Sequence, residues 1–168
     1  FVVNTSRVLV ANFVASQVNI SLSSNPLLGG STSGGGTVNS GSSVTVRATP
    51  NSGYSFLNWT ENGSIVSTLA NYNFTANSNR NLVANFTTNQ YTLSLSASPA
   101  NGGTTTGGGL YNAGSAVSIN ATPTNAGFSF TNWTENGNVV STLANYNFTI
   151  NGNRNLVANF ATVQAGPD

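Results

Sequence analysis

The chain of 168 residues is rich in small polar residues and almost free of charge, with four Arg, three acidic residues and a net charge of +1. It contains no Lys, His, Cys or Met, which leaves no thiol nucleophile, no Ser-His-Asp triad, no His/Cys zinc cluster and no disulfide framework. No basic stripe is present for phosphates, and no apolar run reaches the roughly 18 residues of a membrane helix. We therefore expect no cofactor, no metal, no nucleic-acid partner and no membrane insertion.

Two similar repeats follow one another along the chain. The string "NWTENG" begins at residues 58 and 132, and a Gly-Gly-Gly run begins at residues 34 and 107. Self-similarity at a nearly fixed period determines the architecture before any local pattern does. The predicted units are an incomplete repeat at 1–15, full repeats at 16–88 and 89–162, and a tail or linker at 163–168.

The opening segment predicts strands that have no complete repeat of their own. The strings "FVV" and "RVLVANF" occupy residues 1–3 and 7–13, and the second string nearly repeats the ends of both full repeats. Such strands cannot bury their apolar side chains alone, so we expect pairing with an edge of the next repeat or with another chain by strand addition. The alternative is a terminal strand packed on its neighbour in a longer tandem array. The strand-donor candidates are Val8, Leu9, Val10 and Phe13.

Each full repeat predicts about five or six short, mainly antiparallel strands. Apolar and polar residues alternate, as at 91–98, and turn-forming pairs such as Asn-Pro, Gly-Gly and Asn-Gly separate the runs. We expect at most one helical turn, near "STLAN". The predicted fold class is therefore all-β, with each repeat either β-grasp-like or a small sandwich.

An aromatic cluster in each repeat predicts the core. Because Trp59 follows Phe56 by three residues, a regular strand would place the two rings on opposite faces. Either a bulge returns Trp59 to the core, which we favour, or the ring points outward. In the outward alternative, Trp59 and Trp133 would stack on sugar rings.

Each full repeat also contains one acid and one Arg at a fixed spacing of 19 residues: Glu61 with Arg80, and Glu135 with Arg154. We predict a structural ion pair in each repeat. A glycosidase would need two carboxylates about 5–10 Å apart, whereas these two Glu residues occupy equivalent places in different repeats. The sequence therefore predicts a protein that is not an enzyme.

The ordered blocks "YTLSLSASP", "FSFTNWTENG", "YNFTI" and "NRNLVANF" resemble the divergent InlB B-repeat family. The resemblance covers both full repeats and the opening segment. It implies a small β-rich module, arranged in tandem in secreted or cell-surface bacterial proteins, that acts as a stalk, spacer or adhesive segment. It also implies an extracellular location, and it brings no catalytic residues.

Several Asn residues lie in Asn-X-Ser/Thr triplets between core-facing strand positions, so their side chains should face solvent. They are either N-glycosylation candidates or part of an uncharged polar outer face. These residues are Asn19, Asn73, Asn85, Asn120 and Asn147.

Three functional hypotheses remain open. The favoured one is a non-catalytic structural segment of an extracellular surface or fibre-forming protein, whose partners are other copies of the chain or neighbouring repeats. The second is a module that binds a surface polysaccharide and requires exposed Trp59 and Trp133. The third is an accessory region of a secreted enzyme.

Overall fold

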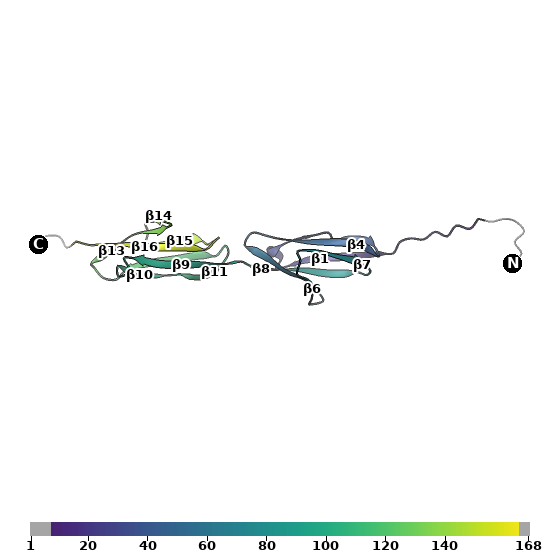
Figure 1. Ribbon diagram of the computed structural model, residues 1–168, viewed down its shortest axis with the longest axis horizontal. Helices are drawn as coiled ribbons and strands as arrows, with labels where there is room; N and C mark the ends of the chain where they lie inside the picture. The colour runs from purple at the N-terminus through teal and green to yellow at the C-terminus, as the bar shows by residue number, and fades with distance from the viewer. Residues whose placement is uncertain (1–7, 165–168) are drawn as a thin grey trace, which may run out of the picture. The chain divides into compact units, whose positions relative to one another are not determined.

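The computed structural model describes residues 8–164, and apart from one 3-10 turn the regular structure in that range is β-strand (Figure 1). Its contacts divide the chain into two compact units, one drawn mainly from the first repeat and one mainly from the second, with Asn51–Ser55 grouped in the second unit. Within residues 8–164 there is no helix that is long and apolar enough to span a membrane. The predicted all-β fold class, with two tandem modules, is confirmed.

The first repeat is built from two sheets. A five-stranded sheet has the order β3-β1-β8-β5-β6, and a three-stranded sheet has the order β2-β4-β7. The strands are β1 (Gln17–Asn25), β2 (Gly30–Ser33), β3 (Gly36–Asn39), β4 (Ser42–Pro50), β5 (Tyr54–Glu61), β6 (Ser64–Ser67), β7 (Asn71–Ala76) and β8 (Arg80–Thr88), and the 3-10 turn η1 is Leu27–Gly29.

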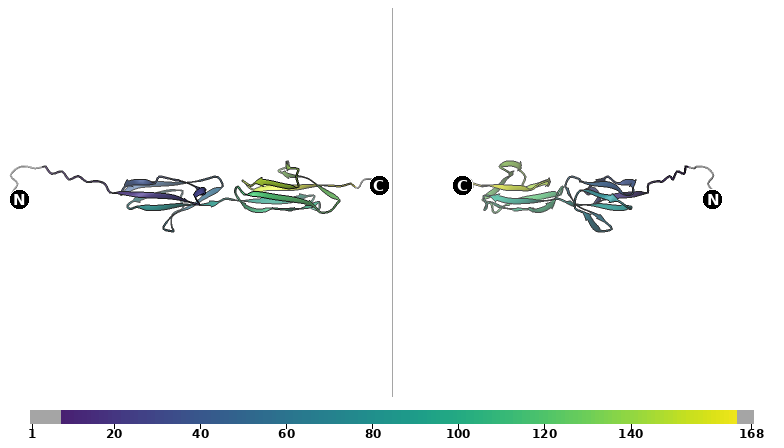
Figure 2. Two further views of the ribbon diagram at one scale, coloured as in Figure 1. Left: turned by 180° about the vertical axis from the view of Figure 1, so that it is seen from behind. Right: turned by 45° about the vertical axis from the view of Figure 1, so that its right-hand side comes forward.

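The second repeat has the same arrangement, with sheets ordered β11-β9-β16-β13-β14 and β10-β12-β15. Its strands are β9 (Gln90–Ser98), β10 (Gly103–Thr106), β11 (Gly109–Asn112), β12 (Ala116–Pro123), β13 (Phe128–Glu135), β14 (Asn138–Ser141), β15 (Asn145–Thr149) and β16 (Arg154–Thr162). The β13–β14 hairpin projects from the second repeat, and the β5–β6 hairpin projects from the first repeat in the same way (Figure 1 and Figure 2).

The last strand of each repeat lies in the middle of the larger sheet. β8 pairs in parallel with β1, from Ile20 opposite Arg80 to Asn25 opposite Asn85, and its other neighbour is β5. β16 likewise pairs in parallel with β9 and antiparallel with β13. The five-stranded sheet is therefore complete only when the last strand of the repeat has paired with both of its neighbours.

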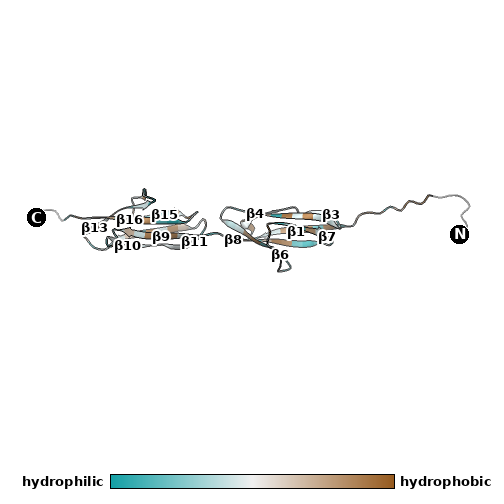
Figure 3. Cartoon of the chain, viewed as in Figure 1, coloured by the Kyte–Doolittle hydropathy of each residue, from teal (hydrophilic) through white to brown (hydrophobic). Residues whose placement is uncertain are grey.

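A single apolar core lies between the two sheets of the second repeat. Apolar and polar positions alternate along the strands (Figure 3). On β16 every second side chain from Leu156 to Phe160 is buried. Because the buried residues come from both sheets, the module is a sandwich and not a β-grasp. They are Leu93, Val117, Ile119, Ala121, Trp133, Ile150, Leu156, Ala158 and Phe160.

The structure differs from the expected elements in two respects and agrees with them in a third. Each repeat has eight strands where five or six were expected, because short strands such as β2, β3 and β6 lie within Gly-rich stretches and tight hairpins. The "STLAN" segments form bends, and the helical turn lies instead at Leu27–Gly29. A register shift between Phe130 and Asn132 supplies the bulge that the spacing of the aromatic residues required.

The segment at residues 8–16 forms no strand. Val8, Leu9, Phe13 and Val14 are each at least 90% exposed. The prediction that this segment pairs with an edge of the following repeat is therefore wrong for the described residues. The string "FVV" at 1–3 lies outside the described range.

A Gly-Gly pair in each repeat allows a phenylalanine of the last strand to approach the backbone closely. A Cβ atom added at Gly102 would lie 2.8 Å from Cβ of Phe160, and one added at Gly29 would lie 2.7 Å from Cβ of Phe86. Neither Phe Cβ can move without its strand, so a side chain at either glycine displaces backbone. Glycine is therefore required at these positions because a side chain has no room. Backbone conformation does not require it, since neither glycine has a positive φ.

We predict that Gly102→Ala destabilises the second repeat by about 1–3 kcal/mol, because the added methyl group overpacks the site against Phe160. Urea unfolding followed by tryptophan fluorescence measures the loss. The matched control is Gly152→Ala, where an added Cβ meets nothing within 4 Å and no backbone strain arises. Equal stability of the two variants would contradict this account of the Gly-Gly pair.

Candidate functional site

The charged side chains form a clasp in each repeat, defined here as the Glu61–Arg80 pair in the first repeat and the Glu135–Arg154 pair in the second. Arg80 begins β8 and Glu61 ends β5, so two neighbouring strands bring them together. Arg80 Nη2 lies 2.6 Å from Glu61 Oε2, and Nε donates to both carboxylate oxygens at 3.2 and 3.0 Å. In the second repeat the Arg154 Nη2 to Glu135 Oε2 distance is 2.7 Å. Both predicted ion pairs are present, with the fork geometry that makes Arg–carboxylate pairs strong.

The clasp also joins the two sheets of its repeat. The Arg80 guanidinium carbon lies 4.4 Å from the ring centroid of Phe74 and 5.6 Å from that of Tyr72, and Nη1 donates to the Tyr72 hydroxyl at 3.2 Å. Tyr72 and Phe74 belong to β7 in the three-stranded sheet. One Arg therefore holds a carboxylate in its own sheet and stacks on rings of the opposite sheet.

The clasp changes the acid–base properties of both partners. The hydrogen bond from Arg80 is the main cause that lowers the pKa of Glu61, and burial opposes it. The hydrogen bond to Glu61 raises the pKa of Arg80 above its already high ordinary value. Glu135 and Arg154 shift in the same directions for the same reasons. A carboxylate held ionised in this way is a poor general acid near neutral pH.

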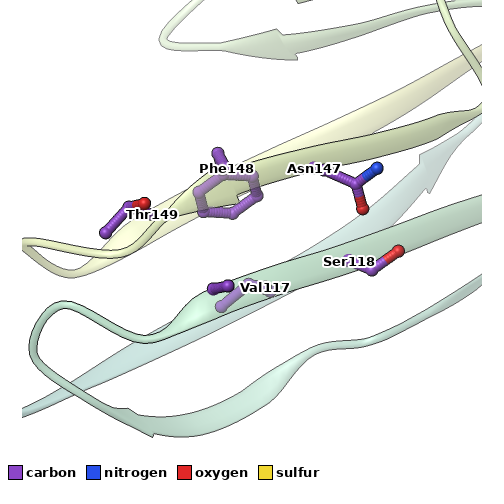
Figure 4. A pocket seen from close by; sticks show the side chains of 6 residues that line it. Val117, Ser118, Asn147, Phe148 and Thr149 are labelled. Carbon is purple, nitrogen blue, oxygen red and sulfur yellow. The ribbon is translucent and has the colours of Figure 1, made fainter.

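No three His, Cys, Asp or Glu side chains gather within residues 8–164. A hollow of about 390 Å³, open to solvent, lies between β12 and β15 of the second repeat (Figure 4). Its lining is uncharged: Ala116, Val117, Ser118, Asn147, Phe148 and Thr149.

Both tryptophans are core residues. Trp59 and Trp133 are 0% exposed, and their indole nitrogens donate to the backbone carbonyls of Ala70 at 3.2 Å and Ala144 at 3.1 Å. In the second repeat the bulge lies in β13 itself, just before Trp133, and the ring centroids of Trp133 and Phe130 are 6.0 Å apart. In the first repeat the ring centroids of Trp59 and Phe56 are 6.1 Å apart. Neither ring has a face free for a sugar, so the assignment of these residues to carbohydrate stacking is wrong.

A ladder of amide side chains, not anticipated from the sequence, crosses the outer face of the larger sheet. In the first repeat Asn85 Nδ2 donates to Asn58 Oδ1 at 2.8 Å and to Thr60 Oγ1 at 3.0 Å, and Asn25 Nδ2 donates to Asn85 Oδ1 at 3.1 Å. Asn159 repeats the first two bonds with Asn132 and Thr134. The sequence feature that could have predicted this ladder is the recurrence of "NWT" and "VANF" in both repeats, because these strings contain the Asn and Thr residues that bond to one another.

The glycosylation candidates differ in accessibility. Asn19, Asn73 and Asn147 are exposed, whereas Asn85 and Asn120 are half-buried. The Asn85 amide nitrogen already donates two hydrogen bonds in the ladder, so a glycan there would disrupt the sheet face. Glycosylation at the exposed positions stays a prediction.

The fold and these sites define a tandem array of β-sandwich modules in which the paired charges are structural. The profile of the family described as the divergent InlB B-repeat domain matches residues 20–90 and 93–164, and the chain therefore belongs to that family. Comparison with curated proteins and with solved structures finds no match to this chain.

We predict that Arg80→Lys destabilises the first repeat by about 1 kcal/mol, because an ammonium group can neither form the fork with Glu61 nor stack flat on Phe74. Urea unfolding of the full chain measures the change. Arg47→Lys is the matched control, since Arg47 is exposed on β4, and it should change stability by less than about 0.5 kcal/mol. Equal losses of stability in the two variants would contradict a stabilising role of the clasp.

The clasps also predict a pH dependence of stability. Because the folded pKa of each Glu lies below its unfolded value, the stabilisation is full above the ordinary Glu pKa of about 4.3 and is lost as pH falls through the folded value. The free energy of unfolding of the wild type should therefore decrease below about pH 5. The double variant Glu61→Gln/Glu135→Gln should be less stable at pH 7 and show a flatter profile. Parallel profiles would contradict the assignment.

Proposed function

We propose that this chain is a non-catalytic structural segment of a secreted or cell-surface bacterial protein, where it acts as a stalk or spacer. The observation that carries the proposal is the parallel pairing of the first and last strands in each repeat. Because β1 and β8 are neighbours that run in the same direction, the chain enters a repeat at one end and leaves it at the other.

The strand lengths give this arrangement a scale. β8 contains nine residues, which at about 3.3 Å each separate the entry and exit of one repeat by about 30 Å. The connection between the two repeats is short, since Asn89 alone lies between the end of β8 and the start of β9. A chain that crosses each module from end to end gains length with every added repeat, as a spacer requires.

The site chemistry supports the same proposal. Each carboxylate of the two clasps forms an ion pair with an Arg, and within residues 8–164 no three His, Cys, Asp or Glu side chains gather. The surface is formed largely by uncharged Asn, Ser and Thr side chains, which remain hydrated without attracting a charged partner. Proteins that contain this family of repeats are typically extracellular or attached to the surface of bacteria.

The polysaccharide-binding alternative loses the residues that motivated it, because Trp59 and Trp133 are buried. The accessory-module alternative concerns a catalytic domain outside these residues, and no feature of either repeat favours it.

Antibodies raised against the folded chain test the location. They should label intact cells of the source organism or detect the chain in the culture medium, and protease treatment of intact cells should remove the cell-bound signal. A cytoplasmic protein followed in the same samples controls for lysis. Detection only after the cells are broken would overturn the proposed function.

A further inference from the structure

The segment at residues 7–13, exposed over its described residues 8–13, has almost the sequence of the last strand of each repeat. It reads "RVLVANF", whereas residues 80–86 and 154–160 both read "RNLVANF". The sole difference is Val8 in place of Asn81 or Asn155. Both of those Asn residues are exposed on the outer face of their sheets, where a β-branched residue is well tolerated in a strand.

The shared residues are those that the last strand uses to complete its repeat. On β8, Leu82, Ala84 and Phe86 are at most 6% exposed and form part of the core. Arg80 forms the clasp with Glu61, and Asn85 forms the centre of the amide ladder. At the described equivalent positions the opening segment has Leu9, Ala11, Asn12 and Phe13, and Arg7 in the sequence corresponds to Arg80.

These residues suit a central position in a sheet better than an edge. Asn85 accepts a hydrogen bond from Asn25 of β1 on one side and donates to Asn58 of β5 on the other. The equivalent Asn12 finds both partners only between two strands of those types. Phe86 packs against Gly29 in its own repeat, so Phe13 requires a similar Gly-Gly pair.

Neither described repeat offers such a position, because β8 and β16 already fill it. The described residues 8–13 form no strand, with Leu9 91% and Phe13 92% exposed. A strand tethered within its own repeat competes at an effective concentration in the millimolar range, so a complete repeat does not accept a second copy of that strand readily.

We propose that residues 7–13 are a donor strand that completes the five-stranded sheet of another repeat of this class, one whose last-strand position is filled by no other strand. The acceptor is recognised by a Glu equivalent to Glu61, an Asn/Thr pair equivalent to Asn58 and Thr60, and a Gly-Gly pair that receives Phe13. The proposal rests on the tandem structural role proposed above and assigns the partner surface that this role uses.

The first part of the test asks whether the donor sequence functions at the last-strand position. Asn155→Val makes residues 154–160 identical to residues 7–13 within the full chain. We expect this variant to unfold within about 2 °C of the wild type, as an exposed strand substitution should. A loss of more than about 8 °C would show that the donor sequence does not fit the position and would overturn the proposal.

The second part creates an unfilled position in the full chain. Leu156→Asp places a carboxylate where Leu156 is 1% exposed, so β16 is replaced by the intact opening segment of a neighbouring copy. Light scattering should then show a mass at least twofold above the 17.2 kDa monomer as concentration rises, while Trp133 fluorescence remains that of a buried indole.

Two controls complete this part. The wild type should remain at 17.2 kDa, because both of its last-strand positions are filled. The double variant Leu9→Asp/Leu156→Asp should also remain monomeric, with Trp133 exposed. A monomeric Leu156→Asp chain at every concentration would overturn the proposal, as would assembly that is unaffected by Leu9→Asp. Neither result bears on cell-surface location, so failure here is distinct from failure of the proposed function.

Discussion

The position of the last strand between the first and fifth strands is the constraint on which each repeat depends. β8 contributes Leu82, Ala84 and Phe86 to the core, Arg80 to the clasp and Asn85 to the amide ladder. One strand therefore supplies the apolar, ionic and polar contacts that hold the sandwich together. The same residues recur in β16, so the two modules are closed by the same contacts.

The near absence of charge gives the few charged groups a structural role. In a chain of 168 residues with seven charged side chains, four of those side chains form the two clasps. In each clasp the Arg guanidinium lies over a phenylalanine ring of the opposite sheet and so connects the two sheets. The outer faces use amide and hydroxyl side chains instead, and these bond to one another across strands. Such a surface is suited to a passive connecting element, which has no charged ligand to attract.

Alternation along the strands was sufficient to predict the all-β class, and the constant spacing of Glu61 and Arg80 was sufficient to predict their pairing. The order of the strands could not be predicted, because alternation tells which side chains face inward but not which strands are neighbours. The burial of Trp133 depends on a bulge between Phe130 and Asn132, since one additional residue moves a side chain to the other face. The pattern at residues 8–13 predicts a strand, but the structure has none there, because a strand forms only where neighbouring strands accept its backbone hydrogen bonds.

The parallel pairing of β1 with β8 has a mechanical consequence. When the two ends of one repeat are pulled apart, the force acts along these neighbouring strands in opposite directions at their outer ends. The hydrogen bonds from Ile20–Arg80 to Asn25–Asn85 are then loaded in shear and share the force, whereas the bonds of a hairpin pulled at its open end break one after another. The topology that supports the proposed spacer role thus also suits each module to bear tension along its length.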